Sequence, residues 1–91
     1  MIIDITIMSL KRDMRAIDAV IEYDGFTEEA GDMCIALLDR MTGLLNERIS
    51  EPLLDFIFSN LNHWYDVTKL VLAIAHADDP DYKMPQIFGD E

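Results

Sequence analysis

The first quarter of the chain carries an apolar stripe with the spacing of a helix. Its members recur at alternating intervals of four and three residues: Ile3, Ile7, Leu10, Met14, Ile17 and Ile21. This period places one apolar seam along a helix. Residues 3–7 also alternate between apolar and polar side chains, as a short strand would, but the longer stripe favours a helix. Asp24 and Gly25 end it. Its start, at residue 3 or near Ser9, stays open.

A second helix follows a short polar connection. Thr27 is a good N-cap, and Glu28 and Glu29 suit the positive end of the helix dipole. The spacing then repeats at Ala30, Cys34, Leu37, Met41 and Leu44, and Met33, Ile35, Leu38 and Leu45 widen the apolar face. A helix with so broad an apolar face is typical of a central position. Gly43 disfavours the helix by about 1 kcal/mol relative to Ala, which the close approach of another helix would explain.

A third helical segment begins at Ser50-Glu51-Pro52, which combines a capping residue, a first-turn acid and a tolerated proline. Its apolar face consists of Leu53, Ile57, Leu61, Trp64, Val67, Val71 and Ile74. Residues 59–63 form a largely polar patch of weak helix formers, which favours a break or kink near residues 60–62 over the alternative of one long helix. The segment ends at Asp78-Asp79-Pro80. Beyond it we expect an extended strap, held to a surface by Tyr82, Met84, Ile87 and Phe88.

These patterns predict an all-α fold of one domain. The expected architecture is a small antiparallel helical bundle of three or four helices over residues 1–79, with an extended acidic tail over residues 80–91. Phe56 and Phe58 flank the main seam of the third segment. Together with the broad face of the second helix, they leave more apolar surface than three helices hide. We expect this apolar surface to be buried by self-association into a homodimer. The alternative is that the tail and a fourth short helix cover it.

The net charge of the chain limits the classes of molecule that it can bind. Eighteen acids against seven Lys and Arg give a net charge of -11 in 91 residues, of which 51% are hydrophobic. Acidic disordered chains are poor in hydrophobic residues, so a folded domain with a negative surface is expected. Such a surface repels nucleic acid and anionic membranes and attracts basic proteins. The acids are densest in residues 24–50, with six acids and two bases, and in residues 78–91, with five acids and one base.

The cysteine content and the apolar runs indicate the compartment. Cys34 is the single cysteine, which excludes an intramolecular disulfide and fits a reducing environment. No charged segment followed by an apolar one opens the chain, as a signal peptide would require. The longest uncharged stretches, residues 56–65 and 70–77, are far shorter than the roughly 20 apolar residues that span a bilayer. We expect a cytoplasmic protein that does not bind membranes.

The chain offers little for catalysis or metal binding. His63 and His76 are about 220° apart around a continuous helix and do not converge on a metal ion. His63 is expected to pair with Asp66, and His76 to lie near the negative end of its helix. Cys34 falls on an apolar stripe without a basic neighbour one turn away, which favours a structural cysteine. No glycine-rich phosphate loop is present. We therefore expect no enzyme, no cofactor and no metal.

The preferred function is an acidic helical inhibitor or adaptor. Carboxylates on rigid helices can occupy the basic groove of a nucleic-acid enzyme, and the chain's size, charge and helical class are similar to those of small inhibitors of nucleases, restriction systems and CRISPR effectors. The candidate contacts are Asp24, Glu28, Glu29, Asp32, Asp39, Asp78, Asp79 and Asp81, with Tyr65 as an aromatic anchor. The alternative is a structural or regulatory helical dimer, a small subunit that binds through apolar helix faces.

Overall fold

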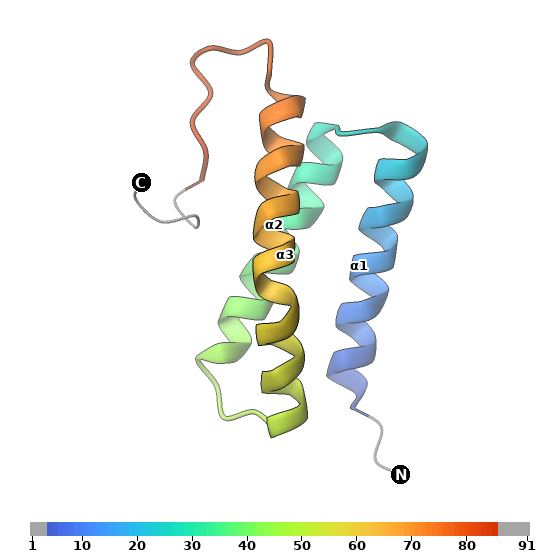
Figure 1. The fold of residues 1–91 in the computed structure, drawn as a ribbon, viewed down its shortest axis with the longest axis vertical. Coiled ribbons are helices and arrows are strands. Elements are labelled where there is room, and N and C mark those ends of the chain that lie inside the picture. Colours follow the sequence, from blue (N-terminus) through green and yellow to red (C-terminus); the bar gives the residue numbers. More distant parts are fainter. Residues whose placement is uncertain (1–3, 86–91) are drawn as a thin grey trace.

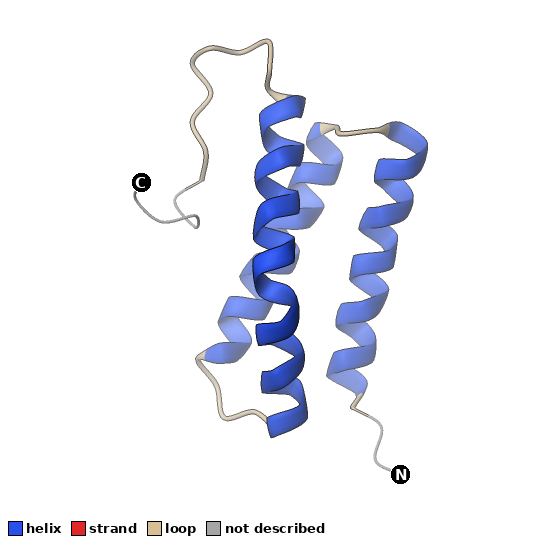
Figure 2. Cartoon of the chain, in the orientation of Figure 1, coloured by secondary structure: helices blue, strands red, loops and turns tan. Residues whose placement is uncertain are grey.

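The computed structural model describes residues 4–85, and these form three helices. They are α1 (Ile5–Asp24), α2 (Glu28–Leu45) and α3 (Glu51–Ala75). In Figure 1 α1 ascends, α2 descends and α3 ascends, with α2 passing behind α3. Between residues 4 and 85 the chain is helix and loop without a strand (Figure 2), so the predicted all-α class is confirmed over that range.

The start of α1 is fixed by a capping aspartate. Asp4 Oδ1 accepts hydrogen bonds from the backbone N–H groups of Thr6, at 2.9 Å, and Ile7, at 3.1 Å. Residues 5–8 are therefore helical, and the strand alternative is wrong for them. Ser50 caps α3 by accepting from the N–H of Leu53 at 3.3 Å, and its hydroxyl lies 3.3 Å from Asp4 Oδ2. This contact brings the first turns of α1 and α3 to the same end of the molecule.

The connection between α1 and α2 has the turn chemistry that the sequence predicts. Gly25 has a φ of +82°, which glycine adopts at little cost, and its N–H donates to the carbonyl of Ile21 at 2.9 Å. Thr27 Oγ1 accepts from the N–H of Ala30 at 3.2 Å. The end of α1 and the N-cap of α2 are thereby confirmed. α3 ends at Ala75, three residues before the expected stop signal at Asp78.

α3 is one helix of 25 residues, so the expected break near residues 60–62 is wrong. Ile57 and Trp64, on either side of the polar patch, are both buried against the other helices. The amide of Asn60 donates to the carbonyl of Phe56 at 2.8 Å, one turn back in the same helix. Because tertiary burial outweighs a few tenths of a kcal/mol of unfavourable propensity per residue, the helix passes through the patch.

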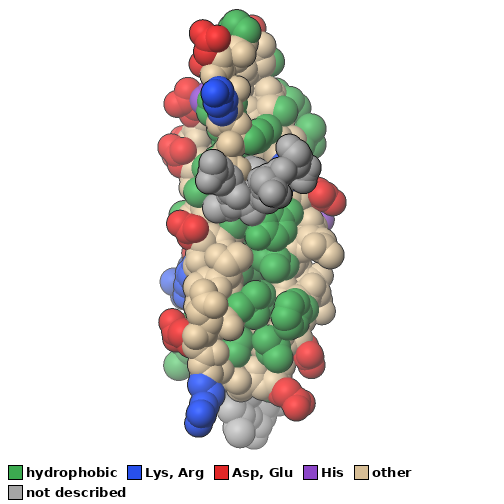
Figure 3. Space-filling view, turned by 90° about the vertical axis from the view of Figure 1, so that its left-hand side faces the viewer, with side chains coloured by type: hydrophobic (Ala, Val, Ile, Leu, Met, Phe, Trp, Pro, Cys, Tyr) green, Lys and Arg blue, Asp and Glu red, His purple; other side chains and the backbone are tan. Residues whose placement is uncertain are grey.

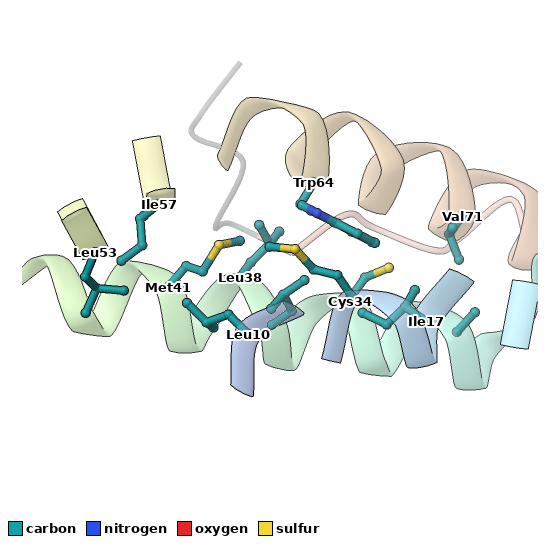
Figure 4. Packing of buried hydrophobic residues seen from close by; sticks show 12 residues of the cluster. Leu10, Ile17, Cys34, Leu38, Met41, Leu53, Ile57, Trp64 and Val71 are labelled. Atoms are coloured by element: carbon teal, nitrogen blue, oxygen red, sulfur yellow. The ribbon is translucent and has the colours of Figure 1, made fainter. Parts of the chain in front are cut away.

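The core lies along α2. α2 packs most extensively against α3 and also against α1, as its broad apolar face predicts. Figure 4 shows Trp64 of α3 pointing toward the layer of side chains that α2 contributes. The buried apolar cluster consists of Leu10, Met14, Ile17, Ala30, Cys34, Leu37, Leu38, Met41, Leu53, Ile57, Trp64 and Val71. None of the three helices is long and apolar enough to cross a bilayer.

The glycine at the helix contact is not the one that the sequence suggests. A Cβ added at Gly43 meets nothing within 4 Å, whereas one added at Gly31 would lie 2.6 Å from Cδ2 of Leu72. Gly31 is itself buried on the side of α2 that faces α3. The close approach of α3 therefore occurs at Gly31. At Gly43 there is room for a side chain, so a residue with a higher helix propensity than glycine fits there.

We expect Gly43→Ala to raise the free energy of unfolding by about 0.5–1 kcal/mol, because alanine is the better helix former and the site is open. Gly31→Ala should gain less or destabilise, since the packed side chain of Leu72 must move. Urea denaturation followed by circular dichroism measures both variants. Equal gains at the two positions would contradict the assigned contact between α2 and α3.

Candidate protein-binding surface

Three of the predicted acidic residues share one side of α2. Glu28, Asp32 and Asp39 fall within an arc of about 40° around the helix, at 100° per residue. All three are exposed. The side of α2 that carries Arg40 is turned to α1, because the Arg40 guanidinium lies 2.7 Å from the Asp13 carboxylate. Asp39 lies about 100° around α2 from Arg40, so the acidic row is displaced from the side that meets α1.

The segment after α3 meets the first turns of α2. His76 is the C-cap of α3, the position expected for it near the negative end of that helix. Its imidazole stacks on the ring of Tyr82, with ring centroids 3.7 Å apart and planes within 4°. Nδ1 of His76 lies 3.9 Å from Oε2 of Glu28. These contacts bring His76 and Tyr82 to the first turns of α2, and the predicted acids Asp78, Asp79 and Asp81 lie between them in the chain, all exposed.

The electrostatics of Tyr82 report the same proximity. Burial is the first cause that raises the pKa of the Tyr82 hydroxyl, and the negative charges of Asp32 and Glu28 raise it further. Asp79 organises the turn that places this ring: its carboxylate accepts from the N–H of Asp81 at 3.0 Å, and its carbonyl from the N–H of Tyr82 at 3.2 Å. The tail anchor expected at Tyr82 is thus found. Met84, expected as a further anchor, is 39% exposed, and Ile87 and Phe88 lie outside the described residues.

The remaining predicted residues are divided between this end of the bundle and positions farther along it. Asp24 ends α1, and Glu29 lies beside Glu28 in the first turn of α2, both exposed at the same end of the bundle. Asp39 lies about 10 Å farther along α2 than Asp32. Tyr65 is half-buried on α3 and packs against the core cluster, so it is less exposed than an isolated anchor. The acids form an extended row with one dense end.

The space-filling view shows how charge and apolar surface are arranged. Figure 3 looks at the side of the molecule opposite α1. Acidic side chains are spaced along its left-hand edge, and more lie on the right-hand edge. Between the two edges, apolar side chains gather in a stripe that runs along the long axis. The face therefore combines negative charge with exposed apolar surface.

A polar clamp between α1 and α2 was not anticipated from the sequence. Arg40 bridges Asp13, at 2.7 Å, and the hydroxyl of Ser9, at 2.8 Å. A pocket of about 250 Å³ lies beside it, lined by Asp13, Ala16, Ile17, Met33, Ala36, Leu37 and Arg40. Its two charged groups neutralise each other, and its remaining wall is apolar. The sequence drew attention to another group of bases, Lys11, Arg12 and Arg15, because these are close together along the chain. Of these three, Lys11 lies over the ring of Phe56, with its Nζ 5.8 Å from the ring centroid.

Cys34 and His63, two side chains of types that take part in catalysis, lie apart from the acidic row. Burial is the main cause that raises the pKa of the Cys34 thiol, so the nucleophilic thiolate is disfavoured. His63 stands edge-on to Trp64, with ring centroids 5.4 Å apart, and its expected ion pair with Asp66 is not formed. Across residues 4–85, no three His, Cys, Asp or Glu side chains converge so that they could hold a metal ion.

Comparison of the chain with protein-family models, with curated proteins and with solved structures found no match. Inferences about function therefore depend on the residues of this chain and on their arrangement.

Proposed function

We propose that this protein is an acidic binding module that docks on a basic protein and occupies its nucleic-acid-binding surface. The observation that carries the proposal is the exposed row of Glu28, Asp32 and Asp39 on one side of α2. The contact of His76 with Glu28 extends this row toward the acids that follow α3. A rigid row of carboxylates attracts lysine and arginine that otherwise bind phosphates.

The spacing of the row suits such a surface. Along the helix axis Glu28 and Asp32 are about 6 Å apart, and Asp32 and Asp39 about 10 Å apart. Carboxylates at these intervals can compete with a phosphate backbone for a basic groove. The partner would be a nuclease, a restriction enzyme or a CRISPR effector, and the protein would act by binding, without catalysis, cofactor or direct contact with nucleic acid. The setting we expect is the cytoplasm, where the free Cys34 thiol stays reduced.

The test is retention of a basic nucleic-acid-binding protein by the tagged chain. A nuclease-treated lysate is applied at about 0.1 M and at about 1 M salt, because this change shortens the Debye length from about 10 Å to about 3 Å. We expect the partner to be retained at low salt and lost at high salt. Adding the chain to the isolated partner should then release bound DNA or RNA.

Charge reversal locates the contact. The triple variant Glu28→Lys, Asp32→Lys and Asp39→Lys should weaken the complex at least about tenfold. The matched control reverses three exposed acids outside the row, Asp18, Glu22 and Glu47, with the same change in net charge. Circular dichroism verifies that both variants fold. Equal affinities for the two triple variants would count against the row as the contact, and a salt-resistant partner would count against a charged interface.

The second candidate is a helical dimer that binds through apolar faces. Leu70 and Ile74, one turn apart on α3, are 50% and 46% exposed, and they favour this alternative. Such a dimer would persist at high salt, because salt screens interactions between charges and leaves apolar contacts in place. Sedimentation of the purified chain at both salt concentrations distinguishes it from the charged complex.

A further inference from the structure

α3 carries a second apolar stripe outside the core. Its members are spaced by four, three and four residues: Leu54, Phe58, Leu61 and Tyr65. The stripe is rotated by roughly 100° from the core positions Leu53, Ile57 and Trp64. Phe58 is 59% exposed, and the other three are half-buried. Hydrophobic residues scattered singly over a protein surface need no explanation, but such a row of partly exposed large side chains does.

This stripe lies beside α2 and away from α1. Leu72 continues it toward the end of α3 and fits against Gly31 of α2, which fixes this side of α3 to the seam between the two helices. α2 contributes the half-buried Ile35 on the corresponding side. Lys11 of α1 lies instead over Phe56, on the opposite flank of α3. The apolar stripe in Figure 3, on the side of the molecule away from α1, follows this seam.

Acidic side chains border the stripe on both sides. The row of Glu28, Asp32 and Asp39 lies along its α2 edge, and Asp55 and Asp66 lie on the outer side of α3. All five are exposed, and Figure 3 shows acids on both edges of the face. Lys69, one turn beyond Tyr65, weakens the negative border at that end.

We propose that this face binds an amphipathic helix of a partner protein, apolar on one side and flanked by lysine or arginine. From Leu54 to Tyr65 the stripe extends about 16 Å, which is three turns of a helix and room for anchors at i, i+3 or i+4, and i+7. The acids on both edges are complementary to basic flanks. A second copy of this chain would instead place like charges opposite one another. The inference rests on the proposed function, because it names the form of the basic partner.

The test uses a labelled synthetic helix of leucine and lysine in heptad order, with its binding to the full chain followed by fluorescence anisotropy. Phe58→Asp should weaken binding at least about tenfold, since an exposed aromatic anchor is replaced by a charge. Leu70→Asp, at a half-exposed apolar position on the other flank of α3, adds the same charge and should change affinity less than about twofold. Thermal unfolding verifies that both variants fold.

A scrambled peptide of equal composition and charge separates this inference from the proposed function. It should bind at least about tenfold more weakly, because its apolar residues no longer share a face. Equal binding of both peptides would overturn the helix site and leave the acidic row as a binding surface. Binding of neither peptide would also overturn the helix site. The lysate experiment would then test the acidic row independently of it.

Two further outcomes would assign the stripe to other occupants. A dimer in sedimentation that Phe58→Asp dissociates would give the stripe to a second copy and overturn the proposal. Peptide binding that requires removal of residues 86–91 would give it to the chain's own C-terminal segment, with the same consequence.

Discussion

Trp64→Ala should lower the free energy of unfolding by about 3–5 kcal/mol, the largest effect that we expect from a single substitution. The indole is 3% exposed and points from α3 toward α2 (Figure 4), so its removal leaves a cavity at the most extensive helix contact. At roughly 0.05–0.15 kcal/mol per residue, a domain of this length has about 5–14 kcal/mol in total. Urea denaturation followed by circular dichroism at a helical wavelength measures the loss.

Phe58→Ala is the matched control for Trp64→Ala. Both are aromatic residues within the same helix, but Phe58 is 59% exposed and should change stability by less than about 1 kcal/mol. A loss at Phe58 as large as that at Trp64 would contradict the assignment of core and surface on α3. It would also remove the ground for treating Phe58 as an anchor for a partner.

Cys34 should react with a thiol reagent at least about 100-fold more slowly in the native protein than in the chain unfolded by urea at the same pH. The side chain is fully buried among α1, α2 and α3. Burial raises the pKa of its thiol, and the charge of Asp18 adds to this, while a hydrogen bond with Thr68 acts in the opposite direction. Reagent therefore needs an opening of the bundle. A native rate within about tenfold of the unfolded rate would refute this placement.

The same thiol gives the stability a pH dependence of known sign. Above its ordinary pKa of 9.0 the unfolded thiol loses its proton, whereas the folded thiol, with its raised pKa, still holds it. The folded state then binds more protons, so stability falls as the pH rises beyond about 9. Cys34→Ala removes this component, and its denaturation midpoint should fall less steeply over that range. Parallel curves for the two proteins would contradict the shift.

The helix boundaries at Gly25, Thr27 and Ser50 could be predicted because local chemistry decides them. Thr27 and Ser50 cap α2 and α3 because their side-chain oxygens accept from the N–H groups of the first turn, which is a property of a few neighbouring residues. Gly25 ends α1 for an equally local reason. The patch at residues 59–63 misled the prediction because its weak propensity is also local, whereas the burial of Ile57 and Trp64 that overrides it is not.

The candidate surface could be predicted only in part from the sequence. Helical spacing places Glu28, Asp32 and Asp39 on one side of α2, and their common exposure agrees with that expectation. Spacing within one helix says nothing about what a separate segment brings to it. The stack of Tyr82 on His76, and the approach of His76 to Glu28, depend on how the chain returns after α3.

The sequence by itself determined the helical class, the N-caps of α2 and α3 and the uneven distribution of charge, since each follows from residue type and from periods of a few residues. The tertiary structure alone decided which glycine meets a neighbouring helix, that Arg40 bridges α1 and α2 at Asp13, and that the second stripe of α3 lies between two acidic edges. Such contacts join residues that are distant along the chain. Their energies depend on the relative rotation of packed helices, which no local pattern encodes.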